Sequence, residues 1–359
     1  QFLGAAAGTA AAAGLAGAWA TRALASDGPP AGTDALITIP TLSVQQFSIR
    51  DATGRLGFTN NPSPAMGFLG GPDFPEDPTD LGPLVPLPGG FAEVFEYLAS
   101  IGYFGIEFFS LNQNIGTLGR QPTVEEIRSY LDAAGLKSHG THQGSIGAMF
   151  DPATDGLSTG GMTQVANARI LGHDIIGTAG DPSGRTTLEN NPTNPNQIGW
   201  QEAARRANII GAALREEGLR GYYFHPEQNT FRFFDPVANP ELAETHLISW
   251  FSDNTDPNKV FFELDILHSL SGRKRFPLPS GPDFDPYGWV TSDPKRFLAY
   301  HLKDGNVNPT WAGPPAAGPY VQTFLRTPTF TDAVGVGEGD IGKGYPSDND
   351  PASVGFVAF

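Results

Sequence analysis

The sequence contains no cysteine, and this absence excludes disulfide bonds, thiolate metal ligands and a cysteine nucleophile together. Basic residues are also few, because 22 Lys and Arg stand against 38 Asp and Glu and give a formal net charge of −16. A chain with this charge repels a phosphate backbone, so we expect no nucleic-acid partner. After the first thirty residues, no run of about 18 consecutive apolar residues occurs, and we expect no membrane span there.

The chain opens on an Ala/Gly-rich apolar segment that ends in Ala23-Leu24-Ala25. An apolar run closed by an A-x-A sequence is typical of a secretory signal peptide. The first four residues, Gln-Phe-Leu-Gly, resemble the part of a twin-arginine signal that follows its two arginines. We therefore predict a partial export signal over residues 1–25, a linker over 26–40, and a mature protein that starts near Ser26 in the periplasm or outside the cell. A core or membrane helix is the alternative, but Ala and Gly insert weakly into bilayers.

From Leu42 onward, short strand-like runs alternate with helical segments, which is typical of a parallel sheet built from βα units. The predicted helices are 91–100, 122–134 and 200–217. A length of 359 residues permits one large domain, so we expect an α/β fold, a (β/α)8 TIM barrel over residues 41–359. An eighth strand is either the apolar end 354–359 or lies beyond Phe359. The seven predicted strands are 42–49, 105–109, 136–142, 174–179, 221–225, 260–265 and 297–302.

Three long Gly/Pro-rich stretches, residues 51–90, 181–199 and 305–334, each follow a predicted strand. Loops of this length are uncommon unless they are functional or disordered. In a barrel, the loops that follow strands build the active face. We therefore expect the active face to include these stretches.

Titratable residues close three successive predicted strands. His225 ends strand 221–225, and Glu227 follows two residues later, so both side chains point to one face if the chain stays extended. Asp265 closes strand 260–265, and His301 lies near the end of strand 297–302. Because the carboxyl ends of barrel strands meet at one face, we expect these groups to converge. Such a mixture of carboxylate and imidazole suits manganese, magnesium, cobalt or zinc, and does not choose among them.

Each of these residues also has a structural interpretation. A single His at a strand end is more often a hydrogen-bonded loop residue than a ligand, and Asp265 alone would serve to cap the following turn. The alignment of Glu227, Asp265 and His301 at three strand ends favours a metal site. Three further titratable residues lack such an alignment, and we expect structural roles for Glu263, Asp304 and His173.

Six blocks of the sequence resemble, in order, those of the xylose-isomerase-like sugar phosphate isomerase/epimerase superfamily. The resemblance covers about residues 42–341, and its most specific part is His-Leu-Lys-Asp at 301–304 with Gly-Glu-Gly-Asp-Ile at 337–341. The other blocks are Gln-Phe-Ser-Ile-Arg-Asp at 46–51, Gly-Tyr-Phe-Gly-Ile-Glu at 102–107, Tyr-Phe-His-Pro-Glu at 223–227 and Glu-Leu-Asp at 263–265.

The resemblance implies a divalent metal held by a Glu of strand five, an Asp of strand six, a His of strand seven and a Glu of strand eight. The first three correspond to Glu227, Asp265 and His301. Many relatives have Tyr-His-Asn-His in strand five where this chain has His225 followed by Pro and Glu, so His225 is the alternative ligand. The Glu of strand eight has no counterpart before Phe359, which leaves the fourth ligand undefined.

The activity implied is that of a sugar isomerase or epimerase, with elimination by a lyase as a further option, through an enediolate. A free or keto-modified sugar fits export better than a sugar phosphate does. Glu227 is the candidate ligand or base, and His225 and Lys303 are expected to hold or polarise substrate oxygens. The residues expected to contact substrate are Glu107, His142, His268 and Glu338.

Two other classes of function stay open. A non-catalytic extracytoplasmic sugar-binding barrel would keep the pocket without the metal. A metal-dependent phosphodiesterase of the endonuclease type would need more His and acidic ligands and a basic groove, and the charge of −16 and seven His residues disfavour it. The sequence does not indicate an oligomeric state.

Overall fold

The computed structural model describes residues 42–49, 90–113, 118, 120–194, 196–276, 284–305 and 333–334 of the chain. Its parallel strands form two sheets, in the orders β1-β2-β3 and β6-β7-β8-β9, with every neighbouring pair parallel. The predicted α/β class is therefore confirmed. The strands are β1 (Ser43–Gln45), β2 (Gly105–Phe108), β3 (Lys137–Thr141), β6 (Ile175–Gly180), β7 (Gly221–Pro226), β8 (Val260–Asp265) and β9 (Phe297–His301).

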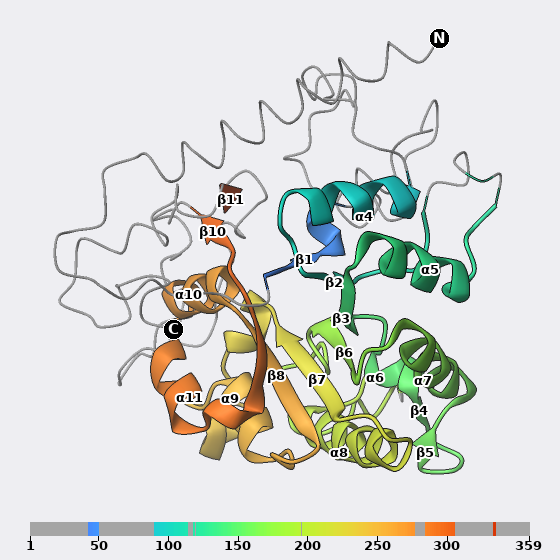
Figure 1. Cartoon of the computed structure of the whole chain (residues 1–359). Coiled ribbons are helices and arrows are strands. Elements are labelled where there is room, and N and C mark those ends of the chain that lie inside the picture. Colours follow the sequence, from blue (N-terminus) through green and yellow to red (C-terminus); the bar gives the residue numbers. More distant parts are fainter. Residues whose placement is uncertain are drawn as a thin grey trace, which may run out of the picture.

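Helices connect the strands and lie outside them (Figure 1). Two short antiparallel pairs join β4 (Phe150–Asp151) to β5 (Gly156–Leu157), and β10 (Asp304–Gly305) to β11 (Ala333–Val334). The α-helices are α4 (Gly90–Ser100), α5 (Val124–Ala134), α6 (Ile146–Met149), α7 (Thr159–Leu171), α8 (Trp200–Glu216), α9 (Leu247–Asp253), α10 (Ile266–Arg275) and α11 (Pro286–Ser292). The 3-10 helices are η1 (Gln46–Ile49), η2 (Gln228–Phe231), η3 (Pro240–Leu242) and η4 (Pro294–Arg296).

The two sheets adjoin between β3 and β6. Just after β3, the backbone N–H of Gly144 donates to the carbonyl of Gly177 at 2.8 Å, and Gln143 forms an isolated bridge with Thr178. The approach is close, because a Cβ atom at Gly140 would lie 3.1 Å from Cγ1 of Ile175. The described strands thus follow one another in chain order around a common interior. Residues 354–359, the candidate eighth strand, lie outside the described residues.

The strands have an outer and an inner face. All residues of β2, β7 and β8 are buried, as expected for parallel strands covered on both sides. Outward side chains such as Tyr222, Phe224 and Phe262 pack in a large core with the helices. Inward, Tyr223 and Phe261 belong to a small apolar cluster. The polar residues discussed below lie nearer the carboxyl ends of the same strands.

Local sequence signals explain the helix ends that the sequence predicted. At the start of α5, the hydroxyl of Thr123 accepts the N–H of Glu126 at 3.2 Å, and the Glu126 carboxylate accepts the N–H of Thr123 at 2.8 Å. This reciprocal pair satisfies two N–H groups that have no partner within the helix. The helix ends at Gly135, whose φ of 74° is accessible to glycine at little cost.

Several elements differ from the prediction, since α6, α7 and α9 to α11 lie where no helix was predicted and the first strand is shorter. Strand 42–49 is shorter than expected, because β1 ends at Gln45 and a 3-10 turn begins at Gln46. The side chain of Gln46 is buried, and its oxygen accepts the N–H groups of Phe109 and Ser110 at 2.9 and 2.7 Å. Helix α7 lies where none was predicted, since its buried positions include small residues such as Gly161 and Ala168 that give a weak apolar pattern.

Of the three long predicted loops, only 181–199 lies within the described residues, apart from residue 195. It folds back on the chain: Ser183 Oγ donates to the carbonyl of Ile198 at 2.7 Å, and Arg232 forms an ion pair with Asp181 at 3.0 Å. The predicted export signal and linker lie outside the described part of the chain. Within that part, no helix has both the length and the apolar character needed to cross a bilayer.

Candidate metal centre

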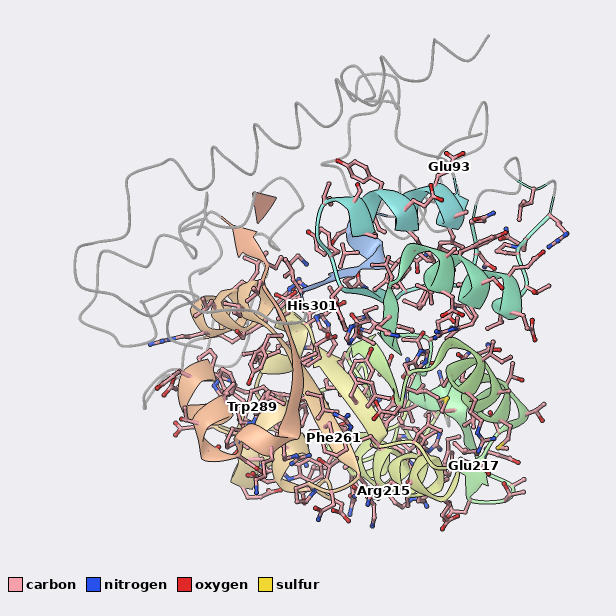
Figure 2. The ribbon with its side chains drawn as sticks, viewed as in Figure 1. Glu93, Arg215, Glu217, Phe261, Trp289 and His301 are labelled. Atoms are coloured by element: carbon pink, nitrogen blue, oxygen red, sulfur yellow. The ribbon has the colours of Figure 1, made fainter. Side chains whose placement is uncertain are left out.

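The inward side chains of β7 and β8 change from apolar to titratable toward the carboxyl ends of the strands. Alternation along β8 places Phe261, Glu263 and Asp265 on one face, and alternation along β7 does the same for Tyr223 and His225. Figure 2 shows His301, at the end of β9, in the middle of the molecule and well separated from Phe261. The apolar cluster therefore forms the floor beneath a polar site.

Three residues form a group in which two members offer ligand atoms that have no hydrogen-bond partner among the described residues. His225, Asp265 and His301 each offer an N or O atom, and these atoms all lie within 4.8 Å of one another. Oδ2 of Asp265 is 3.6 Å from Nε2 of His225 and 3.7 Å from Nδ1 of His301. Oδ2 of Asp265 and both ring nitrogens of His225 are buried without a hydrogen-bond partner among the described residues. We call this group the open triad.

Asp265 uses its two carboxylate oxygens differently. Oδ1 accepts the backbone N–H of His268 at 2.8 Å and caps α10, which is the structural role considered for this residue. Oδ2 points to the unpartnered imidazole of His225. The cap therefore fixes the carboxylate and leaves one oxygen available as a ligand.

The open triad fits a divalent cation. Ligands held at about 2.1 Å in a tetrahedral arrangement lie about 3.4 Å apart, close to the spacings around Oδ2. Buried polar atoms without partners are otherwise costly, and a bound cation would satisfy all three side chains. Three protein ligands leave a further position open, as in catalytic rather than structural zinc sites.

A second group lies directly beneath the open triad and shares His301. Nε2 of His301 is 3.0 Å from Glu107 Oε2 and 3.0 Å from Glu263 Oε1. Nε2 of His142 is 3.1 Å from Glu107 Oε1 and 2.8 Å from Glu263 Oε2. The hydroxyl of Tyr223 also donates to Glu107. We call Glu107 and Glu263 the carboxylate pair; two imidazoles and a phenol surround it.

The charges of this group compensate one another. Burial alone would raise the pKa of Glu107, but the charges and hydrogen bonds of His142 and His301 hold it well below its ordinary value. Burial likewise opposes protonation of His142, yet Glu107 and Glu263 raise the pKa of His142 to about 9. The lowered pKa values of Glu107 and Glu263 and the raised pKa values of His142 and His301 favour ionised carboxylates with the protons on imidazole.

Two more polar side chains border the open triad. Nζ of Lys303 lies 3.6 Å from Oδ2 of Asp265 and 3.3 Å from Nε2 of His268. Burial lowers the pKa of His268 to about 3, so its ring is neutral and can accept a hydrogen bond from Lys303. Lys303 is about one-third exposed and faces the same site as the unpartnered atoms.

The structure brings most of the predicted site residues together, but not Glu227. Strand β7 ends at Pro226, and Glu227 keeps an extended backbone, with φ of −93° and ψ of 167°, before the 3-10 helix η2 begins, so the alternation assumed for the His225–Glu227 pair holds. Glu227 is half-buried and belongs to neither candidate ligand group of the described residues. His225, the alternative ligand, belongs to the open triad. Glu338 lies outside the described residues.

Sequence reasoning missed two members of the site. Glu263 was expected to be structural, but it contacts both His142 and His301. Its position two residues before Asp265 on an otherwise apolar strand was an available signal, because both side chains must share a face. Tyr223 has the same relation to His225. By contrast, His173 bonds to Ser138 at 2.7 Å, in keeping with its expected structural role.

Comparison with known proteins gives only distant similarities. No protein family model and no curated protein matches the sequence. Among solved structures, the chain is similar to a sugar phosphate isomerase/epimerase from Parabacteroides distasonis, with 19% identity, 78% of this chain and 80% of that chain covered, and a TM-score of 0.44. It is also similar to a 3-keto-D-glucoside 4-epimerase from E. coli, with 14% identity, 64% of this chain and 75% of that chain covered, and a TM-score of 0.36. A probable 3-DHS dehydratase from Bacillus anthracis has 14% identity, with 83% of this chain and 84% of that chain covered, and a TM-score of 0.40.

Proposed function

We propose that the protein is a metal-dependent isomerase or epimerase that acts on a free or keto-modified sugar. The single observation that supports this most is the open triad, in which Oδ2 of Asp265 and both ring nitrogens of His225 are buried without a hydrogen-bond partner among the described residues and lie beside His301. The sequence resemblance described above implies the same class of reaction. A small polar substrate also suits a site bordered by Lys303 and His268.

In this proposal, His225, Asp265 and His301 hold the cation. Two imidazoles and one carboxylate favour manganese, cobalt or zinc over magnesium, which prefers oxygen ligands. When bound, such a cation would polarise the carbonyl oxygen of a hydroxy-carbonyl sugar and thereby acidify the neighbouring C–H bond.

The remaining steps are carried out by side chains around the triad. Glu227 follows His225 by two residues and is free of the ligand groups, so its carboxylate is available to accept the α-proton of the sugar. The ammonium of Lys303 would donate a hydrogen bond to a substrate oxygen and offset its developing negative charge. Return of the proton to the other carbon or the other face would give isomerisation or epimerisation, respectively.

Exchange of the α-proton with deuterated solvent tests the division of roles between His225 and Glu227. We expect Glu227→Gln to keep its metal and to slow exchange by about 100-fold to 10,000-fold, the usual contribution of a general base. We expect His225→Asn to lose metal affinity. The measurements are NMR-detected exchange over a panel of free ketoses and aldoses, and cobalt titration of both variants.

Two outcomes would contradict the proposal. If Glu227→Gln loses cobalt while His225→Asn retains both cobalt and exchange, Glu227 is the ligand and the assignment is reversed. If the unaltered protein binds sugars but exchanges no α-proton with cobalt, manganese or zinc present, a non-catalytic sugar-binding barrel is favoured instead.

A further inference from the structure

His301 faces two groups through its two ring nitrogens. Nδ1 lies 3.7 Å from Asp265 Oδ2 in the open triad, and Nε2 lies 3.0 Å from both Glu107 Oε2 and Glu263 Oε1. A neutral imidazole that binds a cation through Nδ1 carries its proton on Nε2. That N–H then has the carboxylate pair as its acceptor, an arrangement that orients metal-binding imidazoles and makes them better ligands.

The carboxylate pair can orient His301 only if it is itself held in place. His142 contacts both members, at 3.1 Å from Glu107 and 2.8 Å from Glu263. Glu107 has one more partner, the hydroxyl of Tyr223, and this contact connects β7 to β2 across the interior. Tyr223 is 1% exposed, so water does not replace its hydroxyl as a donor to Glu107.

We propose that Tyr223 is a positioning residue of the metal centre, acting through Glu107 on His301. Its hydroxyl holds Oε1 of Glu107, and Oε2 of the same carboxylate then meets the Nε2 proton of His301. The inference rests on the proposed metal site. It adds that a residue without direct contact to the cation sets how tightly the cation binds.

The chain offers a matched control on the neighbouring residue. Tyr222 is as fully buried as Tyr223, but its hydroxyl points to the other face and donates to the carbonyl of Gly144 at 2.7 Å. Tyr222→Phe and Tyr223→Phe therefore remove the same atom from the same strand at the same depth. Only Tyr223→Phe removes a contact that leads to His301.

The test is competition between the full-length protein and a chelator for cobalt, monitored by the visible spectrum of the bound ion. We expect Tyr223→Phe to bind cobalt about 10-fold to 100-fold more weakly, the usual effect of losing an outer partner of a ligand. Tyr222→Phe should bind within about twofold of the unaltered protein. Glu107→Gln, which keeps the shape of the side chain, should also weaken cobalt binding. If Tyr223→Phe does not fold, the cobalt affinity of Glu107→Gln is the test of the contact between Tyr223 and His301 through Glu107.

The outcomes separate the two claims. If the unaltered protein binds no cobalt, the proposed function fails and this inference fails with it. If the unaltered protein binds cobalt and Tyr223→Phe binds it equally well, the inference alone is overturned. An equal loss in Tyr222→Phe and Tyr223→Phe would also overturn it, because the effect would then come from general damage to β7.

Discussion

The two faces of β7 differ in how completely their polar atoms are satisfied. On the outer face, Tyr222 and Phe224 are fully buried among helix side chains, and the one polar atom they bring, the Tyr222 hydroxyl, has a carbonyl partner. On the inner face, His225 is also buried, yet neither of its ring nitrogens has a hydrogen-bond partner within the part of the chain that the structure describes. The outer face is thus organised for stability, whereas the inner face carries ring nitrogens that a bound cation would satisfy.

The largest expected effect is a loss of stability from a substitution on the outer face of β7. Phe224→Ala removes a fully buried ring that packs against Phe251, and we expect a loss of about 3–5 kcal/mol in the free energy of unfolding. Because the site lies on the opposite face, cobalt affinity per folded molecule should stay unchanged. Urea unfolding together with cobalt titration checks both expectations. A large loss of affinity in the folded fraction would mean that the two faces are not independent.

A smaller effect concerns a buried histidine outside the site. Burial lowers the pKa of His173 to about 4, against an ordinary value of 6.5. The unfolded chain therefore binds a proton more readily, and stability should fall as pH drops from about 6.5 to 4 and not change further from this group below that range. The free energy of unfolding should fall by about 3 kcal/mol in total, because a pKa difference of this size between the folded and unfolded protein corresponds to that free energy.

His173→Gln is the matched variant for this prediction. Glutamine does not titrate, so the difference in unfolding free energy between the two proteins should shrink as the pH falls from 6.5 to 4. A constant difference across that range would show that His173 has an ordinary pKa in the folded protein. The comparison with the site would then lose its reference, since His173 represents a buried imidazole that lies outside both ligand groups and bonds to Ser138 through Nδ1.

The sequence was sufficient to locate strands β6 to β9, because each is a largely apolar run preceded by glycine or a charged residue. The range of β8 was predicted to the residue, and both Asp265 and His301 were placed correctly at strand ends. The sequence did not indicate that His225, rather than Glu227, lies within ligand distance of Asp265 and His301, because that proximity depends on how three strands meet. The partnership of Glu107 with His301 links residues 194 positions apart, and no local pattern indicates it.

The measurement that tests the central claim most directly is metal stoichiometry in the unaltered protein and in Asp265→Asn. The open triad predicts one cobalt or zinc ion per chain by elemental analysis after removal of excess metal. In Asp265→Asn the α10 cap keeps its oxygen acceptor, but the charged ligand is lost, and affinity should fall by more than the roughly 100-fold caused by losing an outer partner. Equal stoichiometry and affinity in both proteins, or no bound metal in the unaltered one, would contradict the account.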